Sequence, residues 1–359
     1  MHKTYMYRIY PSKKQKLIID QTLETCRRLY NTFLYERKDV YKNDGKSITY
    51  HQQAISLPQR KKGNAYLEQV YSQVLQDVAK RADRAFRNFF RRTKAGEKPG
   101  YPRYKGEGRY NSFTYPQSGY GIENGKLKLS YIGSIKINLH QEMEGVVKTC
   151  TIRRRNGKYY VCFSCEAEAT PLEPTGRNVG IDMGVADFCI TSDGEFFPSP
   201  RTYRKAEKAL RRAQKKVSRR KKGSKRRGKA AAELARAHEK VAGQRRDIAH
   251  KTASKLIGKY DMIAHEKLQI KNMVKNRHLS KSISDAGWGI FFGILSYKAE
   301  SAGRKVIEVD PYNTSQICSE CGSIVSKKLS ERWHKCPVCG YSAHRDVNAA
   351  RNILNAAIA

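Results

Sequence analysis

The sequence predicts a multidomain chain that combines helices with two kinds of β structure. The spacing of apolar residues is helical up to about residue 93, changes to a period of two between about 109 and 169, and then alternates between strands and helices. A chain of 359 residues is long enough for two or three such modules around at least one sizeable core. We therefore expect an α/β multidomain chain with a helical module, a small antiparallel β module and a mixed α/β module, in that order.

The charge of the chain points to its partner. It has 71 Lys and Arg against 33 Asp and Glu, a formal net charge of +38, and an excess of this size is typical of proteins that bind polyanions. There is no run of roughly 18 apolar residues that could span a bilayer, and Met1 to Tyr10 lack the apolar stretch of a secretory signal. We expect a nucleic-acid partner, no membrane contact and a cytoplasmic location.

The helical module has two long amphipathic segments. Pro11 and Ser12 form a helix start signal, and Leu17, Leu23, Leu29 and Phe33 follow at helical spacing. The second segment, 64–93, alternates apolar positions with Lys and Arg, so one face packs and the other is cationic. A solvated basic face is the plainer reading, but in a chain of this charge we favour nucleic-acid contact. The candidates here and in the loop after the segment are Arg84, Arg87, Arg91, Tyr101 and Arg103.

The β module is predicted from alternating patterns and turn signals. Asn124-Gly125 and Asn156-Gly157 stand where tight hairpin turns belong. Together with the strands this indicates a small antiparallel sheet, with a β-barrel as one form. Cys162 and Cys165 are three residues apart on a strand, so their side chains point to opposite faces and we interpret them as packed cysteines. The strands are predicted at 126–130, 134–139, 147–153 and 158–166.

The third module alternates strands and helices. A strand over 178–183 and a hairpin over 186–195 and beyond precede thirty residues, 201–230, with sixteen Lys and Arg and a single acid. Their apolar positions keep helical spacing, and Gly223 and Gly228 bracket a turn, so we predict a basic helical hairpin over 201–258 in preference to a disordered basic tail. A strand over 262–264, a helix over 288–302, a strand over 305–309 and a helix from about Arg345 complete the module. The candidate phosphate contacts in the hairpin are Lys215, Lys216, Arg219, Arg220 and Arg226.

Four cysteines predict a structural metal site. Cys318 and Cys321 form one CxxC pair and Cys336 and Cys339 a second, each followed by Gly, with fourteen residues between the pairs. This spacing is typical of a tetrahedral four-cysteine zinc site. Because four thiolates leave no open position, we expect one structural Zn²⁺ that lets a short segment fold.

Three acids on separated elements predict a second metal site. Asp182 lies in a strand, Glu266 at the end of another strand and Asp346 at the start of a helix. Unpaired buried acids are costly, so in so basic a chain they are expected to be paired or to hold cations. This order of elements is the plan of a ribonuclease H-like domain, in which the carboxylates bind two Mg²⁺ ions for phosphodiester hydrolysis. Asp310 competes for the third position; we prefer Asp346 because the cysteine segment separates Asp310 from the last helix.

The chain resembles the TnpB proteins, transposon-encoded RNA-guided DNA endonucleases related to type V CRISPR effectors. The resemblance rests on Val179-Gly180-Ile181-Asp182-Met183-Gly184, on 265–273, on Thr314-Ser315-Gln316 with the four cysteines, and on 345–354, and it extends upstream to 72–76 and 100–104. It implies that Asp182, Glu266 and Asp346 are the Mg²⁺-binding catalytic acids of a RuvC-like nuclease domain. It also implies a guide RNA made from the transposon end, and a target double-stranded DNA that opens into a displaced single strand beside a short flanking motif.

The resemblance further implies a domain plan and a setting. The expected location is the cytoplasm of a bacterium or archaeon, at the nucleoid when on target. Two departures from the family pattern are His344, where relatives often have an acid, and an end at Ala359 with little of the charged tail of many relatives. The implied plan is a wedge domain over 1–11 and 106–172, a helical recognition domain over 12–105, the RuvC-like domain over 173–311 and 342–359, and a zinc ribbon that binds target nucleic acid over 312–341.

Two other functions stay open at this point. One is an RNA-guided DNA-binding repressor that does not cleave; relatives of that kind are expected to lack one of the three acids, and all three are present here. The other is a protein-only transposase, because ribonuclease H-like domains also serve that chemistry.

Overall fold

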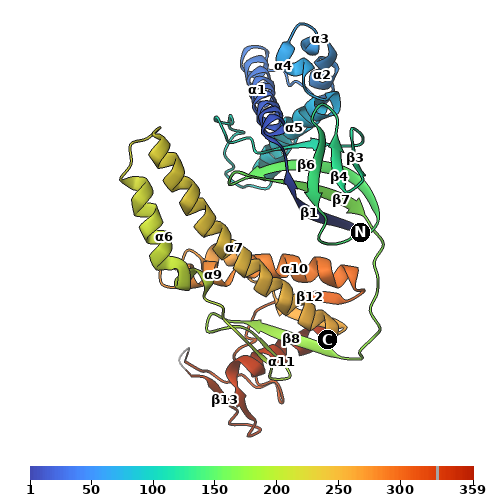
Figure 1. Ribbon diagram of the computed structural model, residues 1–359. Helices are drawn as coiled ribbons and strands as arrows, with labels where there is room; N and C mark the ends of the chain where they lie inside the picture. Colours follow the sequence, from blue (N-terminus) through green and yellow to red (C-terminus); the bar gives the residue numbers. More distant parts are fainter. Residues whose placement is uncertain (329–330) are drawn as a thin grey trace. The chain divides into compact units, whose positions relative to one another are not determined.

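The computed structural model describes residues 1–328 and 331–359. They divide into two compact units, one of residues 2–167 and one of residues 168–359 with Met1. Figure 1 shows the helices of both units, and all of them except α8 are labelled there. They are α1 (Lys13–Asp44), α2 (Tyr50–Ile55), α3 (Leu57–Lys61), α4 (Ala65–Glu68), α5 (Ser72–Lys94), α6 (Thr202–Ser218), α7 (Lys225–Lys259), α8 (Ile270–Met273), α9 (Ser280–Ala286), α10 (Trp288–Ser301) and α11 (Arg345–Ile358).

The strands form three sheets. One belongs to the unit of residues 2–167, and a five-stranded and a two-stranded sheet belong to the other unit. The strands are β1 (His2–Tyr10), β2 (Ser112–Tyr115), β3 (Tyr120–Glu123), β4 (Lys126–Leu129), β5 (Gly133–Asn138), β6 (Val146–Arg155), β7 (Lys158–Glu166), β8 (Asn178–Met183), β9 (Asp187–Thr191), β10 (Phe196–Pro198), β11 (Met262–Glu266), β12 (Lys305–Val309), β13 (Trp333–Lys335) and β14 (Ser342–His344).

The unit of residues 2–167 is built on a seven-stranded antiparallel sheet in the order β2-β6-β7-β1-β5-β4-β3. Both predicted turns are confirmed: φ is 49° and 67° at Asn124 and Gly125, and 50° and 72° at Asn156 and Gly157, the left-handed pair that a tight hairpin needs. Among the strand pairings of the described residues, none joins β2 to β3. The sheet is therefore a half-barrel and not the closed barrel that we considered.

Helices α1 and α5 contribute the apolar face that packs with this sheet. Ile19 and Leu23 of α1 and Val78 of α5 share one buried core with Phe113 and Ile152. The segment predicted as one helix over 64–93 is instead two helices, α4 and α5. Between them, the Val70 N–H bonds to the Leu67 carbonyl at 3.1 Å, and the Val70 carbonyl accepts the Lys61 Nζ at 3.0 Å in place of a helical N–H. Cys165 lies on the buried face of β7 and Cys162 on the other, as predicted.

The unit of residues 168–359 is built on the five-stranded sheet β10-β9-β8-β11-β12. β8, β9 and β10 are antiparallel, whereas β8, β11 and β12 run parallel. The predicted order of hairpin, helical hairpin, strand, helix, strand and last helix is observed, with the short helices α8 and α9 added. Helices α7 and α10 cover one face of the sheet through an apolar core, and α11 lies on the other face.

The basic helical hairpin is formed by α6 and α7 (Figure 1). Ser224 caps α7, its side chain accepting the N–H of Arg227 at 3.1 Å, so Gly228 lies inside the first turns of α7 and does not close the turn as expected. Within the described residues, we find no helix with both the length and the apolar character that a bilayer crossing requires.

An acid from another helix caps α6. Arg201 precedes α6 with φ of 45° and offers no side-chain cap. Asp285 of α9 supplies one, accepting the N–H groups of Tyr203 and Arg204 at 2.8 and 3.2 Å. Arg245 of α7 donates to the same carboxylate at 3.0 Å. One buried carboxylate thus joins α6, α7 and α9.

Candidate active site and metal centre

Two parallel strands place Asp182 and Glu266 on the same face of the sheet. In β8, Val179 and Ile181 enter the core under α7 and α10, so the alternation of the strand turns Gly180 and Asp182 toward the other face. In β11, Ala264 packs on the α11 side, and Glu266 follows two residues later. Ala264 pairs with Gly180 in the register, which puts Glu266 beside Asp182.

Helix α11 brings the third acid to that face, and a glycine allows its approach. A Cβ at Gly180 would lie 2.0 Å from the Ala350 carbonyl oxygen and 2.7 Å from the Leu354 nitrogen. The backbones of β8 and α11 therefore meet without a side chain between them. Asp346 lies one helical turn before Ala350, at the start of α11, and reaches the sheet at the Asp182 end.

Glu266 and Asp346 lie close enough to Asp182 for their charges to act on it. Burial raises the pKa of Asp182 to about 8, and the negative charges of Glu266 and Asp346 add to that increase. The pKa of Glu266 is also raised by burial, against a hydrogen bond from the Thr314 hydroxyl. Groups of the protein therefore compensate only part of the negative charge that the three acids bring to this site.

Asp346 has two arginines beside it, and one of them, Arg345, also lies close enough to Asp182 to oppose the rise of its pKa. Arg345 Nε donates to Asp346 Oδ1 at 3.2 Å, and Arg332 Nη1 lies 3.7 Å from Oδ2. His344 caps α11, its Nδ1 accepting the Asp346 N–H at 3.3 Å, so the residue that departs from the family pattern holds the backbone of the acid. Asp310 is exposed and accepts the N–H of Tyr312 at 2.9 Å.

The donor set fits hard divalent cations. Carboxylate oxygens are the ligands that Mg²⁺ takes from proteins, and three acids with a raised pKa at their centre gain from a cation. Within the described residues, the four cysteines form the one group of three or more such ligands whose atoms all lie within 4.8 Å of one another. The oxygens of the three carboxylates, all of which belong to the described part of the chain, do not all lie within that distance of one another.

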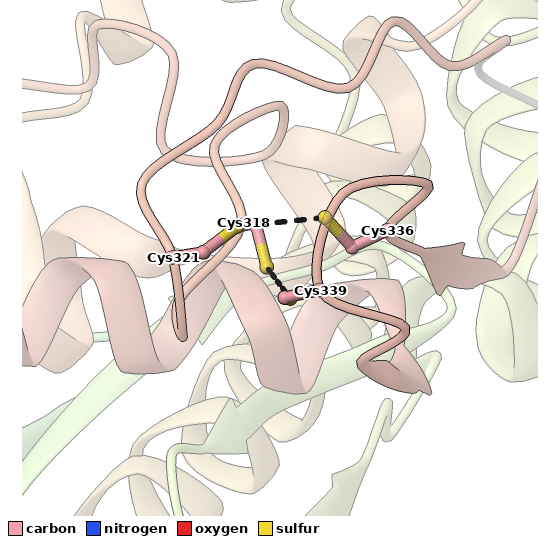
Figure 2. Close-up of side chains that lie close together, drawn as sticks. All are labelled: Cys318, Cys321, Cys336 and Cys339. Atoms are coloured by element: carbon pink, nitrogen blue, oxygen red, sulfur yellow. Dashed lines mark hydrogen bonds between the residues drawn. The ribbon is translucent and has the colours of Figure 1, made fainter.

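The four predicted cysteines come together in one cluster (Figure 2). Cys318 Sγ lies 3.7 Å from Cys339 Sγ, and Cys321 Sγ lies 3.5 Å from Cys336 Sγ. A tetrahedron with Zn–S bonds of about 2.3 Å has S···S edges of about 3.8 Å, so the spacing fits Zn²⁺. Hydrogen bonds with Ser323 lower the pKa of the Cys321 thiol to about 6, which favours the thiolate that zinc binds.

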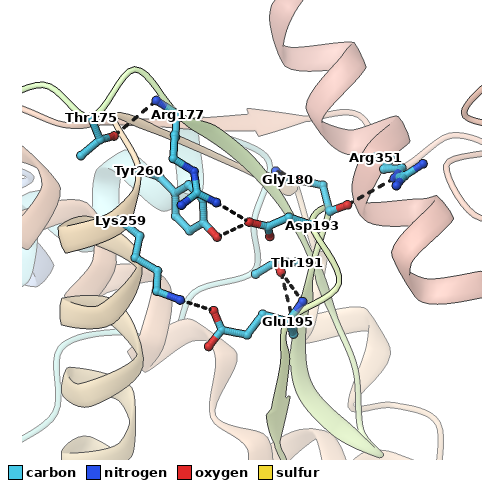
Figure 3. A network of polar contacts seen from close by, with 10 residues as sticks. Thr175, Arg177, Gly180, Thr191, Asp193, Glu195, Lys259, Tyr260 and Arg351 are labelled. Atoms are coloured by element: carbon cyan, nitrogen blue, oxygen red, sulfur yellow. Dashed lines mark hydrogen bonds and ion pairs between the residues drawn. The ribbon is translucent and has the colours of Figure 1, made fainter.

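A polar network fixes the β9–β10 hairpin, which is next to β8, the strand that carries Asp182 (Figure 3). Asp193 in its turn accepts the Tyr260 hydroxyl at 2.6 Å and Arg177 Nη2 at 2.9 Å. Lys259 Nζ of α7 donates to Glu195 at 2.7 Å, and Arg351 Nε of α11 donates to the Ser192 carbonyl at 3.3 Å. The hairpin is therefore held from α7 on one side and from α11 on the other.

The basic candidates of the helical hairpin gather around one cavity. Its volume is about 810 Å³, and it lies at the turn between α6 and α7. Lys216 forms an ion pair with Glu233 at 2.5 Å. It is the one lining residue with an ion pair among the described contacts, so most of the positive charge of the lining is not neutralised by acids. The residues that line it are Arg212, Lys215, Lys216, Arg219, Arg220, Lys221, Ser224 and Arg226.

The candidates of the other unit lie on its surface. Arg84, Arg87 and Arg91 are exposed along α5, and Arg87 pairs with Asp83 at 2.7 Å. Tyr101 packs edge-on against Phe89 with ring centroids 5.1 Å apart and keeps 41% of its surface exposed. Arg103 is also exposed. No contact in the described residues joins these side chains into one pocket.

Thr314, Asn348 and Asn352 had no predicted role, although Thr314 contacts Glu266 and the two asparagines contact the loop that carries Thr314. Thr314 donates its hydroxyl hydrogen to Glu266 Oε1, and the two asparagines are buried on α11. Asparagine is a poor helix former, so two buried asparagines four residues apart in a helix were a signal that they serve another contact.

Three family models match the chain. Residues 160–277 match OrfB_IS605, described as probable transposase, and residues 288–353 match the Cas12f1-like TNB domain. Residues 1–46 match a helix-turn-helix domain, HTH_OrfB_IS605; in the structure they hold β1 and the single helix α1.

Two relatives match along nearly their whole length. A protein of Escherichia coli K12 named as an RNA-guided DNA endonuclease, InsQ, is 32% identical over 377 residues, which cover 99% of this chain and 92% of the relative. A protein of Streptomyces pristinaespiralis named as an RNA-guided DNA endonuclease is 33% identical over 99% of this chain and 90% of its own length.

A solved structure shares the fold. The Cas12f1 chain in a cryo-EM structure of a Cas12f1–sgRNA–target DNA complex aligns with a TM-score of 0.64 at 14% identity, covering 99% of both chains. The chain therefore has a Cas12f-like fold.

Proposed function

Because the chain belongs to the TnpB family of RNA-guided DNA endonucleases, we propose that it cuts double-stranded DNA at sites chosen by a bound guide RNA. The guide is made from the end of the transposon that encodes the protein, and the target lies beside a short flanking motif. The observation that carries the proposal is the convergence of Asp182, Glu266 and Asp346 on one face of the five-stranded sheet.

The proposed roles follow from the site. Asp182 and Glu266 on neighbouring strands and Asp346 on α11 would hold two Mg²⁺ ions, which would activate a water and neutralise the charge on the leaving oxygen. Burial and the two other acids raise the pKa of Asp182 to about 8. Asp182 would therefore have to lose a proton at neutral pH when it binds a cation. Arg345 and Arg332 orient Asp346 from the outer side.

Each proposed domain has its own role in cutting or in nucleic-acid binding. The unit of residues 168–359 contains the RuvC-like nuclease over 173–311 and 342–359, with the zinc ribbon over 312–341 as a contact for target nucleic acid. Residues 1–11 and 106–172 form the wedge domain and 12–105 the recognition domain. A guide–target heteroduplex is held mainly by its backbone charge, which suits the net charge of +38.

The test starts from the protein purified with its native locus. The copurifying RNA is sequenced, and a duplex matched to it is incubated with the complex and Mg²⁺. We expect guided cutting that Asp182→Ala, Glu266→Ala or Asp346→Ala abolishes while guided binding stays. The matched control is Asp310→Ala, an exposed acid in the same unit, which should cut normally.

Three outcomes would contradict the proposal. Cutting that survives ribonuclease treatment would favour a protein-only transposase. Guided binding with no cutting by the wild-type complex would favour a repressor. Normal cutting by all three acid variants would remove these residues from the active site.

A further inference from the structure

A buried threonine contacts one of the three acids. Thr314 is 5% exposed, and its Oγ1 donates to Glu266 Oε1. The hydroxyl has one hydrogen, and its second acceptor, the Pro311 carbonyl, lies farther away at 3.3 Å. One oxygen of Glu266 is thereby fixed.

The loop that carries Thr314 is held by α11, the helix that also carries Asp346. Asn352 Nδ2 donates to the Thr314 carbonyl at 2.8 Å and to the Ile317 carbonyl at 2.6 Å. Asn348 Nδ2 donates to the same Ile317 carbonyl at 2.7 Å. Both asparagines are buried, so this contact is shielded from water.

Asn348 also contacts the segment between Cys318 and Cys321. Asn348 Oδ1 accepts the N–H of Ser319 at 3.0 Å, and Ser319 lies between Cys318 and Cys321. The chain from Thr314 to Ser319 is therefore fixed at three carbonyl or amide groups by one helix. Glu266, Asp346 and the first cysteine pair share this support.

We propose that Thr314 is a positioning residue for Glu266, and that Asn352 holds Thr314 in place through the loop that leads into the cysteine cluster. This inference rests on the proposed role of Glu266 as a metal ligand. Groups that orient a metal-binding carboxylate by hydrogen bonding change metal affinity or activity by about 10- to 100-fold when they are removed.

The test compares two substitutions at position 314. Thr314→Val keeps the shape and removes the hydroxyl, whereas Thr314→Ser keeps the hydroxyl. We expect Thr314→Val to weaken Mn²⁺ binding to the guide-RNA complex, measured by electron paramagnetic resonance, by about 10-fold or more, and to raise the Mg²⁺ concentration for half-maximal cutting. Thr314→Ser should restore both. The matched control is Thr252→Val, a buried threonine of α7, with no expected change.

The role of Asn352 is tested in a double-mutant cycle. Asn352→Ala should weaken Mn²⁺ binding while the zinc content stays near that of the wild type, and Thr314→Val combined with Asn352→Ala should be little worse than Thr314→Val alone, because both changes act through one contact. Additive losses would overturn the role of Asn352.

The failure of this inference is distinct from the failure of the proposed function. If the wild type never cuts a guided duplex, the proposed function fails. If the wild type cuts, Glu266→Ala does not, and Thr314→Val binds Mn²⁺ and cuts like Thr252→Val, this inference alone is wrong. Equal losses in Thr314→Val and Thr314→Ser would also overturn it, since the hydroxyl would then not matter.

Discussion

Gly180 of β8 lies directly against the main-chain carbonyl of Ala350 in α11: a Cβ at position 180 would stand 2.0 Å from that oxygen. Both partners of this contact are backbone, so neither can move aside as a flexible side chain would. The contact sets the distance between the strand of Asp182 and the helix of Asp346.

We predict that Gly180→Ala displaces α11 and uncouples the acids. Cutting should fall by at least about 100-fold, the cost of a 1 Å misplacement in an active site, and the melting temperature should drop. Gly243→Ala on α7 is the matched control, because no atom lies within 4 Å of its added Cβ; replacing a helical glycine there should leave stability unchanged or raise it by about 1 kcal/mol. Full cutting by Gly180→Ala would show that this approach is not needed.

A second prediction concerns the cysteine cluster. Elemental analysis of the purified protein should find about one zinc per chain, and Cys336→Ser should lose it and lower the melting temperature. Cys162→Ser, a half-buried cysteine outside the cluster, should keep the zinc. A wild-type protein free of zinc and equally stable would refute the site.

A third prediction uses the pH dependence of Asp285. Burial favours the protonated form of this acid, but the N–H of Tyr203, the Arg245 side chain, the N–H of Arg204 and the Thr202 hydroxyl together lower its pKa below the usual value of 3.8. The folded-state pKa is depressed, so the charged form contributes stability above pH of about 4 that is lost as the pH falls through the lowered pKa.

The corresponding experiment is a series of denaturant titrations. Asp285→Ala should cost about 3–5 kcal/mol of unfolding free energy at pH 7, as expected when one partner of a buried ion pair is removed, and the difference from the wild type should shrink below pH of about 4. Glu300→Gln, an exposed position on α10, serves as the control. A constant difference between pH 7 and pH 3 would contradict the charge-based role.

A fourth prediction concerns the cavity at the α6–α7 turn. Replacing Lys215, Arg219 and Arg226 by Gln should weaken nucleic-acid binding and make it less sensitive to salt, with the salt slope smaller by roughly one for each lost phosphate contact. Lys251→Gln, which pairs with Asp247 on α7 outside the cavity, should leave the slope nearly unchanged. Equal slopes in both variants would exclude this cavity as a phosphate site.

Local signals in the sequence predicted much of the fold. The Asn156-Gly157 turn, the strand of Asp182 and the two CxxC pairs are each specified by a few neighbouring residues, and the structure has them where expected. The break before α5 was missed because the apolar pattern continues across it, whereas the Val70 carbonyl in the break accepts a hydrogen bond from the Lys61 side chain.

Contacts between segments that are distant in the sequence could not be predicted from such local signals. The cap that Asp285 gives to α6 joins residues about eighty positions apart, and the bond from Thr314 to Glu266 joins residues 48 apart. A single acid or threonine gives no sequence pattern from which its hydrogen-bond partner could be predicted. The convergence of the three acids was expected from the order of the elements, whereas the glycine and asparagines that make it possible emerge only from the packing of α11.

The position of α11 has a consequence for biosynthesis. The helix that delivers Asp346 comes after both strands of the sheet that carry the other acids, so a growing polypeptide has no third carboxylate until residue 346 has left the ribosome. On the proposed assignment, a product that terminates before residue 346 lacks one of the three acids and should not cut DNA.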